Sequence, residues 1–262
     1  MSLVDAFDAH LSGWKEWQAT PWGRLRYRVA QANVQRHLPT GPLRILDVAG
    51  GNGLDTIPLA AAGHHITLVD FSEEMLAEAR RNAEASSVAG RMTLHHADFR
   101  EVPALFPQPA FDVVLCHNLL QYVDDAAEML RMVSHPLKPG GLISVMASNR
   151  YSSAYRTALQ QFDFAAAASQ LGATSSAAQI FDVSVRMYAG EEIIPLLEEA
   201  GCTTLLGHYG VRCVNDYIAN NEIKADPSFF AELEQLELAM SDKYPYYLLA
   251  RFFQLLARKQ VD

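Results

Sequence analysis

The sequence predicts an α/β fold built on a doubly wound, mostly parallel sheet. From residue 44 onward, short apolar runs that suit buried strands alternate with segments of helical periodicity. The first run, Arg44–Ala49, leads at once into Gly50, Gly51 and Gly53, and a helical segment, Leu54–Ala62, follows. The chain has 262 residues, of which 50% are hydrophobic, so one large domain with a sizeable core is expected.

The first 40 residues are expected to form a helical cap or lid, with the main domain in 41–262. An apolar stripe at helical spacing predicts the first helix within residues 1–22; its members are Val4, Phe7, Leu11, Trp14 and Trp17. A turn is expected at Thr20–Gly23 and a second helix at Arg24–Leu38. Arg26 lies in the first turn of that helix, where it is either a surface arginine or a cation for a ligand carboxylate.

The glycine turn after the first strand predicts a nucleotide-type ligand. Strand, glycine turn and helix bring bare backbone N–H groups and a helix N-terminus towards a ligand. A second strand, His65–Val69, ends on Asp70, 19 residues beyond Gly51, and an acid at that distance suits the two hydroxyls of a ribose. A dinucleotide fingerprint needs a third glycine at position 56, but Thr56 stands there, which argues against a nicotinamide dehydrogenase.

The core continues with three more expected strands. Ser72 should cap a helix that runs to Ala85, with two glutamates in its first turn. The further segments expected are a strand at Met92–His95, a proline-bearing connection at Asp98–Pro109, a strand at Phe111–His117, a helix from Asp124 or Asp125, and a turn at Leu137–Gly141 before the fifth strand. Since ligands bind outside the carboxyl ends of parallel strands, the glycine turn, Asp70, Asp98 and His117 should gather at one edge.

The C-terminal third begins with an insertion, Ser148–Val185, which is rich in Ala, Ser and Gln and follows the fifth strand. Beyond it the pattern predicts a helix at Glu191–Ala200, ended by Gly201, in which Pro195 is tolerable only near the first turn. The last elements expected are a sixth strand at Thr203–Val214, a helix at Pro227–Met240 and a closing antiparallel strand at Tyr247–Ala257.

Four landmarks in order resemble the class I methyltransferases that use S-adenosylmethionine (SAM). The segment Asp47–Gly53 resembles their first motif, with Ala49 in place of its first glycine. Asp70, the pair Ala97-Asp98 and the Leu137–Gly141 turn follow at the places where that class has its ribose acid, its adenine-side acid and its turn before the fifth strand. The resemblance implies a seven-stranded Rossmann-like sheet, SAM as cofactor and S-adenosylhomocysteine as product.

Most of the chain also resembles the CmoM family, the methyltransferases of tRNA 5-carboxymethoxyuridine. The matching stretches are Gly23–Arg26, the glycine turn, Phe111–Tyr122, Asn149 with Phe162-Asp163, Leu197–Gly201, and Gly210–Arg212 with Asp216-Tyr217. The resemblance implies SAM contacts at Arg26, Gly51, Asp70, Asp98 and His117. The candidate cofactor site is completed by Asp47, Gly50, Gly53, Phe71 and Phe99.

The candidate catalytic residues are His117 and Arg212. His117 is either a general base for a phenol, hydroxyl or amine acceptor or a residue of the cofactor shell, and a carboxylate acceptor needs no base. Arg212 could orient an anionic substrate through a two-pronged guanidinium contact, or it could form a salt bridge with Asp216. A substrate pocket could be lined by four tyrosines, or these could belong to the core or its rim: Tyr151, Tyr155, Tyr217 and Tyr246.

Charge favours a small acceptor over a nucleic acid. The net charge is −9, and Ala165–Val185 contains no Lys or Arg, whereas a protein that neutralises phosphates needs cations. The leading expectation is methylation of oxygen or nitrogen on a small anionic or aromatic metabolite. The alternatives are the tRNA reaction, which an electropositive face around Arg24, Arg26, Arg150 and Arg156 would favour, and a SAM-binding protein without catalysis.

Cysteine and histidine spacing predicts no metal site and a reducing compartment. The three cysteines are odd in number and lack metal-ligand spacing, and the pairs His64-His65 and His95-His96 lie beside strands and alternate faces. No apolar run approaches the ~18 residues of a membrane span, and no signal pattern opens the chain, so a cytoplasmic protein without membrane contact is expected. The sequence predicts no oligomeric state.

Overall fold

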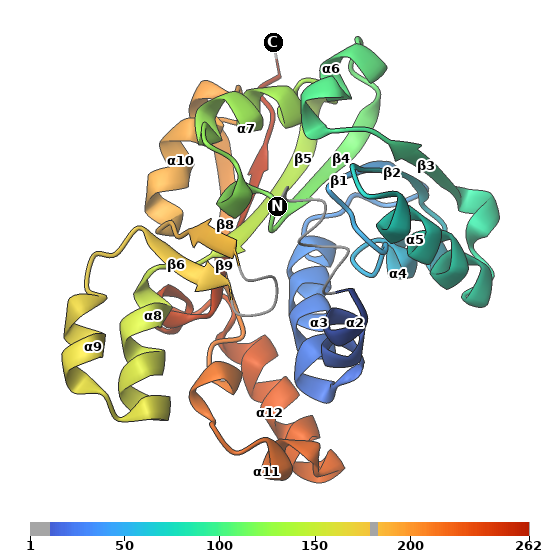
Figure 1. Cartoon of the computed structure of the whole chain (residues 1–262). Coiled ribbons are helices and arrows are strands. Elements are labelled where there is room, and N and C mark those ends of the chain that lie inside the picture. Colours follow the sequence, from blue (N-terminus) through green and yellow to red (C-terminus); the bar gives the residue numbers. More distant parts are fainter. Residues whose placement is uncertain (1–10, 179–182, 262) are drawn as a thin grey trace. The chain divides into compact units, whose positions relative to one another are not determined.

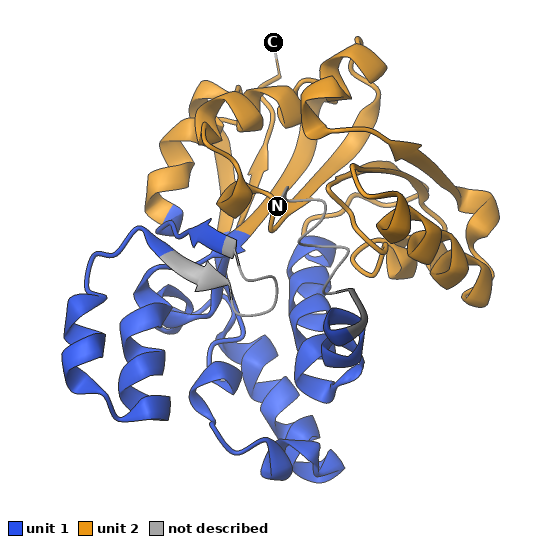
Figure 2. Cartoon of the chain, in the orientation of Figure 1, with its two compact units in different colours: residues 1–36, 147–190, 208–254 blue, residues 37–146, 191–207, 255–262 orange. Residues whose placement is uncertain are grey.

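The computed structural model describes residues 11–178 and 183–261, so the expected contributions of Val4 and Phe7 lie outside the described residues. The chain divides into two compact units. Unit 1 holds residues 1–36, 147–190 and 208–254, and unit 2 holds 37–146, 191–207 and 255–262 (Figure 2). Among the described residues, no helix is long and apolar enough to cross a membrane. The predicted boundary between a cap and a main domain at residue 40 stays a prediction.

A seven-stranded sheet carries the fold, with the strand order β3-β2-β1-β4-β5-β9-β8 (Figure 1). Its strands are β1 Arg44–Val48, β2 His65–Asp70, β3 Met92–His96, β4 Phe111–His117, β5 Leu137–Ser148, β8 Thr204–Val211 and β9 Phe252–Arg258. The first five pair in parallel. Backbone bonds join 140 to 259 and 149 to 251, so β9 runs antiparallel to β5. The predicted α/β, Rossmann-like sheet is confirmed.

Helices follow the first four strands of unit 2, and one more precedes β8. They are α4 Ile57–Ala61, α5 Glu73–Ala85, α6 Val102–Leu105, α7 Ala126–Ser134 and α10 Gly190–Glu199, with short 3₁₀ turns η1 Ala89–Arg91, η2 Phe99–Glu101 and η3 Leu120–Tyr122. Ser72 caps α5 as predicted, because its hydroxyl accepts the Met75 N–H at 3.2 Å. Asp125 caps α7 in the same way. The helix α5 packs against β2 and β3, and α7 packs against β4.

Unit 1 gathers helices from three separate parts of the chain. They are α2 Leu11–Ala19, α3 Pro21–Gln35, α8 Tyr151–Arg156, the π-helical turn η4 Thr157–Gln161, α9 Phe164–Ser169, η5 Asn215–Tyr217, α11 Asn221–Ala225, α12 Pro227–Met240 and η6 Tyr246–Leu249. The insertion after β5 supplies α8, η4 and α9 and ends in a hairpin of β6 Ser175–Ala178 and β7 Val183–Arg186. The helix α12 has the predicted bounds.

Several element boundaries differ from the sequence prediction, each for a local reason. The second helix begins at Pro21 and not at Arg24, since Thr20 accepts the Gly23 N–H at 3.0 Å and Pro21 suits the first helical turn. The glycine turn extends to Thr56, so α4 begins only at Ile57. Pro195 lies inside α10 beyond its first turn. The start of the predicted closing strand, Tyr247–Leu249, is a 3₁₀ turn.

Candidate functional site

The glycine turn after β1 is shaped by a close backbone approach at Gly50. A Cβ at this position would lie 2.7 Å from both the Asp47 carboxylate and the Leu68 side chain, so no other residue fits without a shift. Ala49, which replaces the first glycine of the family motif, has φ 57°, and Gly51 and Gly53 also have positive φ. The side-chain amide of Asn82 in α5 donates to the Asn52 carbonyl at 3.0 Å and fixes the turn from the other side.

Asp47 supports this turn from within the core. Its side chain accepts the Thr56 hydroxyl at 3.0 Å, and both residues are fully buried. Thr56, which broke the dinucleotide fingerprint, is therefore the partner that holds Asp47 in place below Gly50. The geometry favours a structural role for Asp47 within the candidate cofactor site.

Asp70 lies at the carboxyl end of β2, directly against the turn. One carboxylate oxygen accepts the Gly51 N–H at 2.8 Å, and the other accepts the Ser72 N–H at 2.9 Å. Burial raises the pKa of Asp70, although backbone N–H groups of Ser72, Gly51 and Phe71 oppose this. The carbonyl of Phe71 is itself held by the His96 ring at 2.9 Å. The carboxylate is thus fixed in orientation, and each oxygen keeps a lone pair for a ligand hydroxyl.

Asp98 follows β3 and caps the short turn η2 through a capping box with Glu101. It also forms a two-pronged pair with Arg100, at 2.7 and 2.9 Å, and this contact lowers the pKa of Asp98. The Arg100 guanidinium lies 5.6 Å from the centre of the Phe99 ring. Because its pKa is lowered, Asp98 stays ionised at neutral pH. Its side chain is partly exposed.

His117 ends β4, and both of its ring nitrogens face protein oxygens. Nε2 lies 2.8 Å from the Ser144 hydroxyl, and Nδ1 lies 3.2 Å from an oxygen of Asp55 without the alignment of a hydrogen bond. The His117 side chain is only 3% exposed. Ser144 belongs to β5 and Asp55 to the end of the glycine turn, so the ring is hydrogen-bonded to β5 and lies against the turn. Sequence reasoning missed both partners, since a lone serine in an apolar strand and an acid in a turn give no signal.

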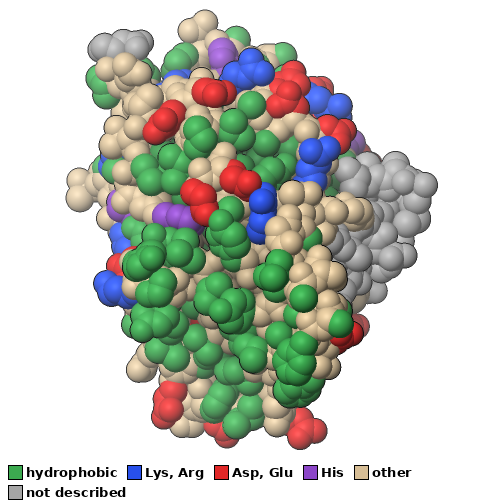
Figure 3. Space-filling view, turned by 90° about the vertical axis from the view of Figure 1, so that its left-hand side faces the viewer, with side chains coloured by type: hydrophobic (Ala, Val, Ile, Leu, Met, Phe, Trp, Pro, Cys, Tyr) green, Lys and Arg blue, Asp and Glu red, His purple; other side chains and the backbone are tan. Residues whose placement is uncertain are grey.

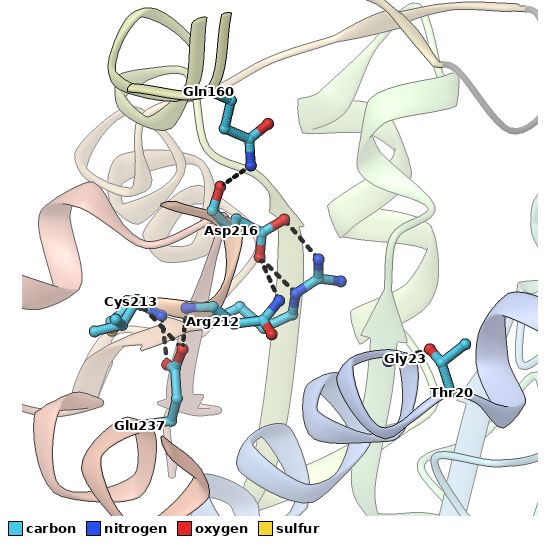
Figure 4. A network of polar contacts seen from close by, with 9 residues as sticks. Thr20, Gly23, Gln160, Arg212, Cys213, Asp216 and Glu237 are labelled. Carbon is cyan, nitrogen blue, oxygen red and sulfur yellow. Dashed lines mark hydrogen bonds and ion pairs between the residues drawn. The ribbon is translucent and has the colours of Figure 1, made fainter. Parts of the chain in front are cut away.

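Arg212 lies in unit 1, just after β8, in an ion pair with Asp216. Nε and Nη2 donate to the two carboxylate oxygens at 2.6 and 2.5 Å, whereas Nη1 takes no part in the pair (Figure 4). The guanidinium carbon lies 5.2 Å from the centre of the Trp17 ring and 5.8 Å from that of Phe252. Burial by itself would raise the pKa of Asp216, but Arg212, Arg251 and Arg156 more than offset it, so the pKa lies below its ordinary value.

A second buried acid, Glu237 of α12, holds the backbone beside this pair. Its carboxylate accepts the N–H groups of three consecutive residues, Cys213, Val214 and Asn215 (Figure 4). Burial raises the pKa of Glu237, and these three donors oppose the rise. The loop that carries Arg212 and Asp216 is therefore anchored from α12, a role that sequence reasoning did not foresee.

The Gly210–Arg212 motif has a steric explanation. A Cβ at Gly210 would lie 2.7 to 2.8 Å from Ala250, Cys213 and Tyr247, so the motif needs glycine there. Arg212 itself has φ 65°, an unusual conformation for a residue with a side chain, and its carbonyl accepts the Arg251 N–H at 3.0 Å.

The four candidate substrate tyrosines lie on elements of unit 1 that pack together, because α8 contacts both η5 and η6. The rings of Tyr155 and Tyr217 meet edge to face at 6.4 Å. Tyr217 donates its hydroxyl to the Leu249 carbonyl, and burial raises its pKa. Tyr151, Tyr155 and Tyr246 are exposed. Arg26, in contrast, is buried on α3, with its guanidinium 4.3 Å from the centre of the Tyr27 ring.

Metal ligands are not gathered anywhere in the described ranges: no group of three or more His, Cys, Asp or Glu side chains there could hold a metal ion. The candidate residues form two clusters, one within each unit. Unit 2 holds the glycine turn, Asp70, Asp98 and His117, and unit 1 holds Arg26, Arg212 and the tyrosines.

Comparisons with known proteins agree with this geometry. A family described as "Methyltransferase domain" matches residues 45–141. The tRNA 5-carboxymethoxyuridine methyltransferase of Escherichia coli K12 is 30% identical over 92% of this chain and 90% of its own length. The ubiquinone biosynthesis O-methyltransferase of Xylella fastidiosa 9a5c is 31% identical over 60% of this chain and 63% of its own.

A solved structure shows the same fold at lower identity. The 1,6-didemethyltoxoflavin-N1-methyltransferase of Burkholderia thailandensis, determined with bound 1,6-didemethyltoxoflavin and S-adenosylhomocysteine, aligns with a TM-score of 0.62 and 18% identity. The alignment covers 98% of this chain and 87% of that one.

The fold, the glycine turn with Asp70 and these matches define a class I SAM-dependent methyltransferase. Within that class, the chain belongs to the CmoM family. It is thus an enzyme that uses SAM, which sets aside the dehydrogenase and the non-catalytic SAM-binding protein.

Proposed function

We propose that this enzyme transfers the methyl group of SAM to an oxygen or nitrogen of a small, anionic or aromatic acceptor. The observation that carries the proposal is Arg212, which is buried, aligned by Asp216 and placed near the rings of Trp17 and Phe252. A planar guanidinium with one nitrogen outside its ion pair suits a carboxylate or similar group, and the rings suit an aromatic body.

The turn and Asp70 fit the cofactor, because the Asp70 carboxylate is held by the Gly51 and Ser72 N–H groups and each oxygen keeps a lone pair for a ribose hydroxyl. We assign backbone contacts to Gly51, the ribose hydroxyls to Asp70, the adenine amino group to Asp98 and the methionine carboxylate to Arg26. When bound, SAM supplies a sulfonium-activated methyl group that an acceptor lone pair takes in line, with the S–C electron pair returning to sulfur. The chain contributes orientation above all, since positioning alone lowers such barriers by several kcal/mol.

His117 is assigned a positioning role in this reaction. Its ring nitrogens face Ser144 and Asp55, so the ring is hydrogen-bonded to β5 and lies against the glycine turn. A carboxylate acceptor, which has no proton to lose, needs no base. A phenol or amine acceptor would need His117 to leave one of these partners before it could take a proton.

The alternative function is methylation of 5-carboxymethoxyuridine in tRNA, and it is favoured by the 92% coverage of the match to the E. coli enzyme. Exposed aromatic side chains on α9 and the turn before it, Phe162 at 73% and Phe164 at 69%, could stack on bases. Figure 3 shows one face of the molecule, whose lower part carries many hydrophobic side chains with few Lys or Arg among them.

The cations expected to favour tRNA are not all presented to solvent. Of Arg24, Arg26, Arg150 and Arg156, only Arg24 is exposed, and Ala165–Val185 has no Lys or Arg. Binding of several phosphates needs several accessible cations. The charge distribution therefore supports the small acceptor.

A transfer assay with methyl-labelled SAM distinguishes the two functions. We expect label to enter small carboxylates, phenols or amines and not tRNA, and we expect S-adenosylhomocysteine to bind the wild type and to be lost from Asp70→Ala. Label in tRNA from cells that lack the modification enzyme would replace the small-molecule proposal by the alternative. We also propose a cytoplasmic location, which the three free, buried cysteines support.

A further inference from the structure

Within the part of the chain that the structure describes, Arg156 and Arg251 of unit 1 form no ion pair of their own. Arg156 ends α8, and its Nε is buried without a hydrogen-bond partner. Arg251 directly precedes β9, and within the described ranges it forms no ion pair. Its guanidinium carbon lies 5.3 Å from the centre of the Phe252 ring, the same ring that Arg212 approaches from 5.8 Å.

The two buried carboxylates described above, Asp216 and Glu237, already have hydrogen-bond donors of their own. Asp216 interacts electrostatically with Arg156, Arg212 and Arg251, but both of its oxygens receive the guanidinium of Arg212. Glu237 is bound to three backbone N–H groups. Lys224, which also interacts with Asp216 and Arg212, adds a further cation.

This arrangement is costly without a counter-ion. Arg156 and Arg251 are both partly buried, and a guanidinium that is partly withdrawn from water among like charges is stabilised by an anionic partner. Burial, together with Arg156 and Arg212, lowers the pKa of Arg251 to about 9. An anion placed among the three arginines would remove this penalty.

We propose that Arg156 and Arg251, with the Nη1 edge of Arg212, bind a carboxylate or phosphate group carried by the methyl acceptor. The inference rests on the proposed function and assigns the acceptor's anionic group to these residues. Guanidinium groups bind both kinds of anion through paired N–H donors.

The backbone that carries these arginines is fixed. The Asn149 side chain donates to the Leu248 and Ala250 carbonyls at 2.8 and 2.9 Å, and its N–H donates to the Arg251 carbonyl at 3.1 Å. Gln160, one helical turn beyond Arg156, donates to the Asp216 carbonyl (Figure 4). A site built on such supports is pre-organised, which reduces the entropy lost on binding.

The test is calorimetric titration of the full chain with phenoxyacetate, phenyl phosphate and neutral phenoxyacetamide, repeated with S-adenosylhomocysteine. The variants are Arg156→Gln and Arg251→Gln, and the matched control is Arg80→Gln, an exposed arginine of α5. We expect one of the anions, but not the amide, to bind the wild type and the control. We expect each test variant to lose about tenfold or more in anion affinity, with unchanged affinity for S-adenosylhomocysteine. The preferred anion identifies the acceptor group.

Two results would overturn the inference: binding of the amide as tightly as both anions, or wild-type anion affinity in both variants. If Arg251→Gln does not fold, Arg156→Gln decides, because Arg156 is partly exposed and ends a short helix. Failure of the wild type to bind S-adenosylhomocysteine would contradict the proposed function instead, and the anion titration, made without cofactor, would still stand on its own.

Discussion

Substitution of Gly50 by alanine tests the steric basis of the cofactor turn. The added Cβ would lie 2.7 Å from the Asp47 Cγ and Oδ2 atoms and from the Leu68 Cγ atom, all of them inside the core. Asp47 cannot simply move away, because it is held by Thr56 at 3.0 Å. Overpacking of this kind costs about 1–3 kcal/mol. For a chain of this size, that corresponds to a fall in Tm of roughly 2–12 °C.

The same change should weaken the cofactor site. To relieve the clash, the backbone must shift at Gly50. This shift would displace the neighbouring Gly51 N–H, which donates to the Asp70 carboxylate at 2.8 Å. We expect the affinity for S-adenosylhomocysteine, measured by calorimetry, to fall about tenfold or more. The matched control is Gly90→Ala, since nothing lies within 4 Å of the Cβ built there. Wild-type Tm and affinity in Gly50→Ala would refute the reasoning.

Three further changes probe single contacts. Asp70→Asn should weaken S-adenosylhomocysteine binding roughly ten- to hundredfold. Because burial raises the pKa of Asp70, the wild-type affinity should begin to fall at a pH above the ordinary aspartate pKa of 3.8, and the variant should not show this fall. Calorimetry from pH 4 to 7 tests this, and the same pH dependence in both proteins would contradict it. Glu237→Ala leaves three N–H groups without their acceptor and should lower the free energy of unfolding by about 3 kcal/mol or more. Glu237→Gln, which keeps one acceptor oxygen, should lower it less. A Tm equal to that of the wild type in both variants would disprove the anchoring role. His117→Gln should lower Tm and cofactor affinity while the pH profile of kcat keeps its shape, whereas loss of a limb of that profile would identify His117 as the base.

The sequence predicted the parallel core well because its signals are local. The bounds of β4 and α12 match the prediction, and those of β2, β3 and α5 match to within one residue. Each of these elements has either an apolar run ended by a polar residue or a capping residue such as Ser72 at its start. The helix at Pro21 starts earlier than predicted because the Thr20 hydroxyl caps it. The later starts at Ile57 and Phe252 follow turns whose backbone hydrogen bonds no sequence pattern records.

The proximity of Gly51 and Asp70 in the candidate cofactor site could also be predicted from the sequence, since the spacing along a βαβ unit determines where these two residues meet. Arg212 was foreseen with two roles, substrate contact or salt bridge, and the structure shows the salt bridge to Asp216. The substrate role of its remaining edge stays a proposal.

By itself, then, the sequence determined the class of fold, the glycine turn and the acids that follow the strands, because these depend on neighbours close along the chain. Only the tertiary structure decided which buried charges share a partner. Asp55 and Ser144 at His117, Glu237 beneath the Arg212 loop, and Arg156 beside Arg251 come from segments up to about 95 residues apart. Such pairings arise from packing, since a buried polar group takes whatever partner the fold brings to it, and no local pattern records that choice.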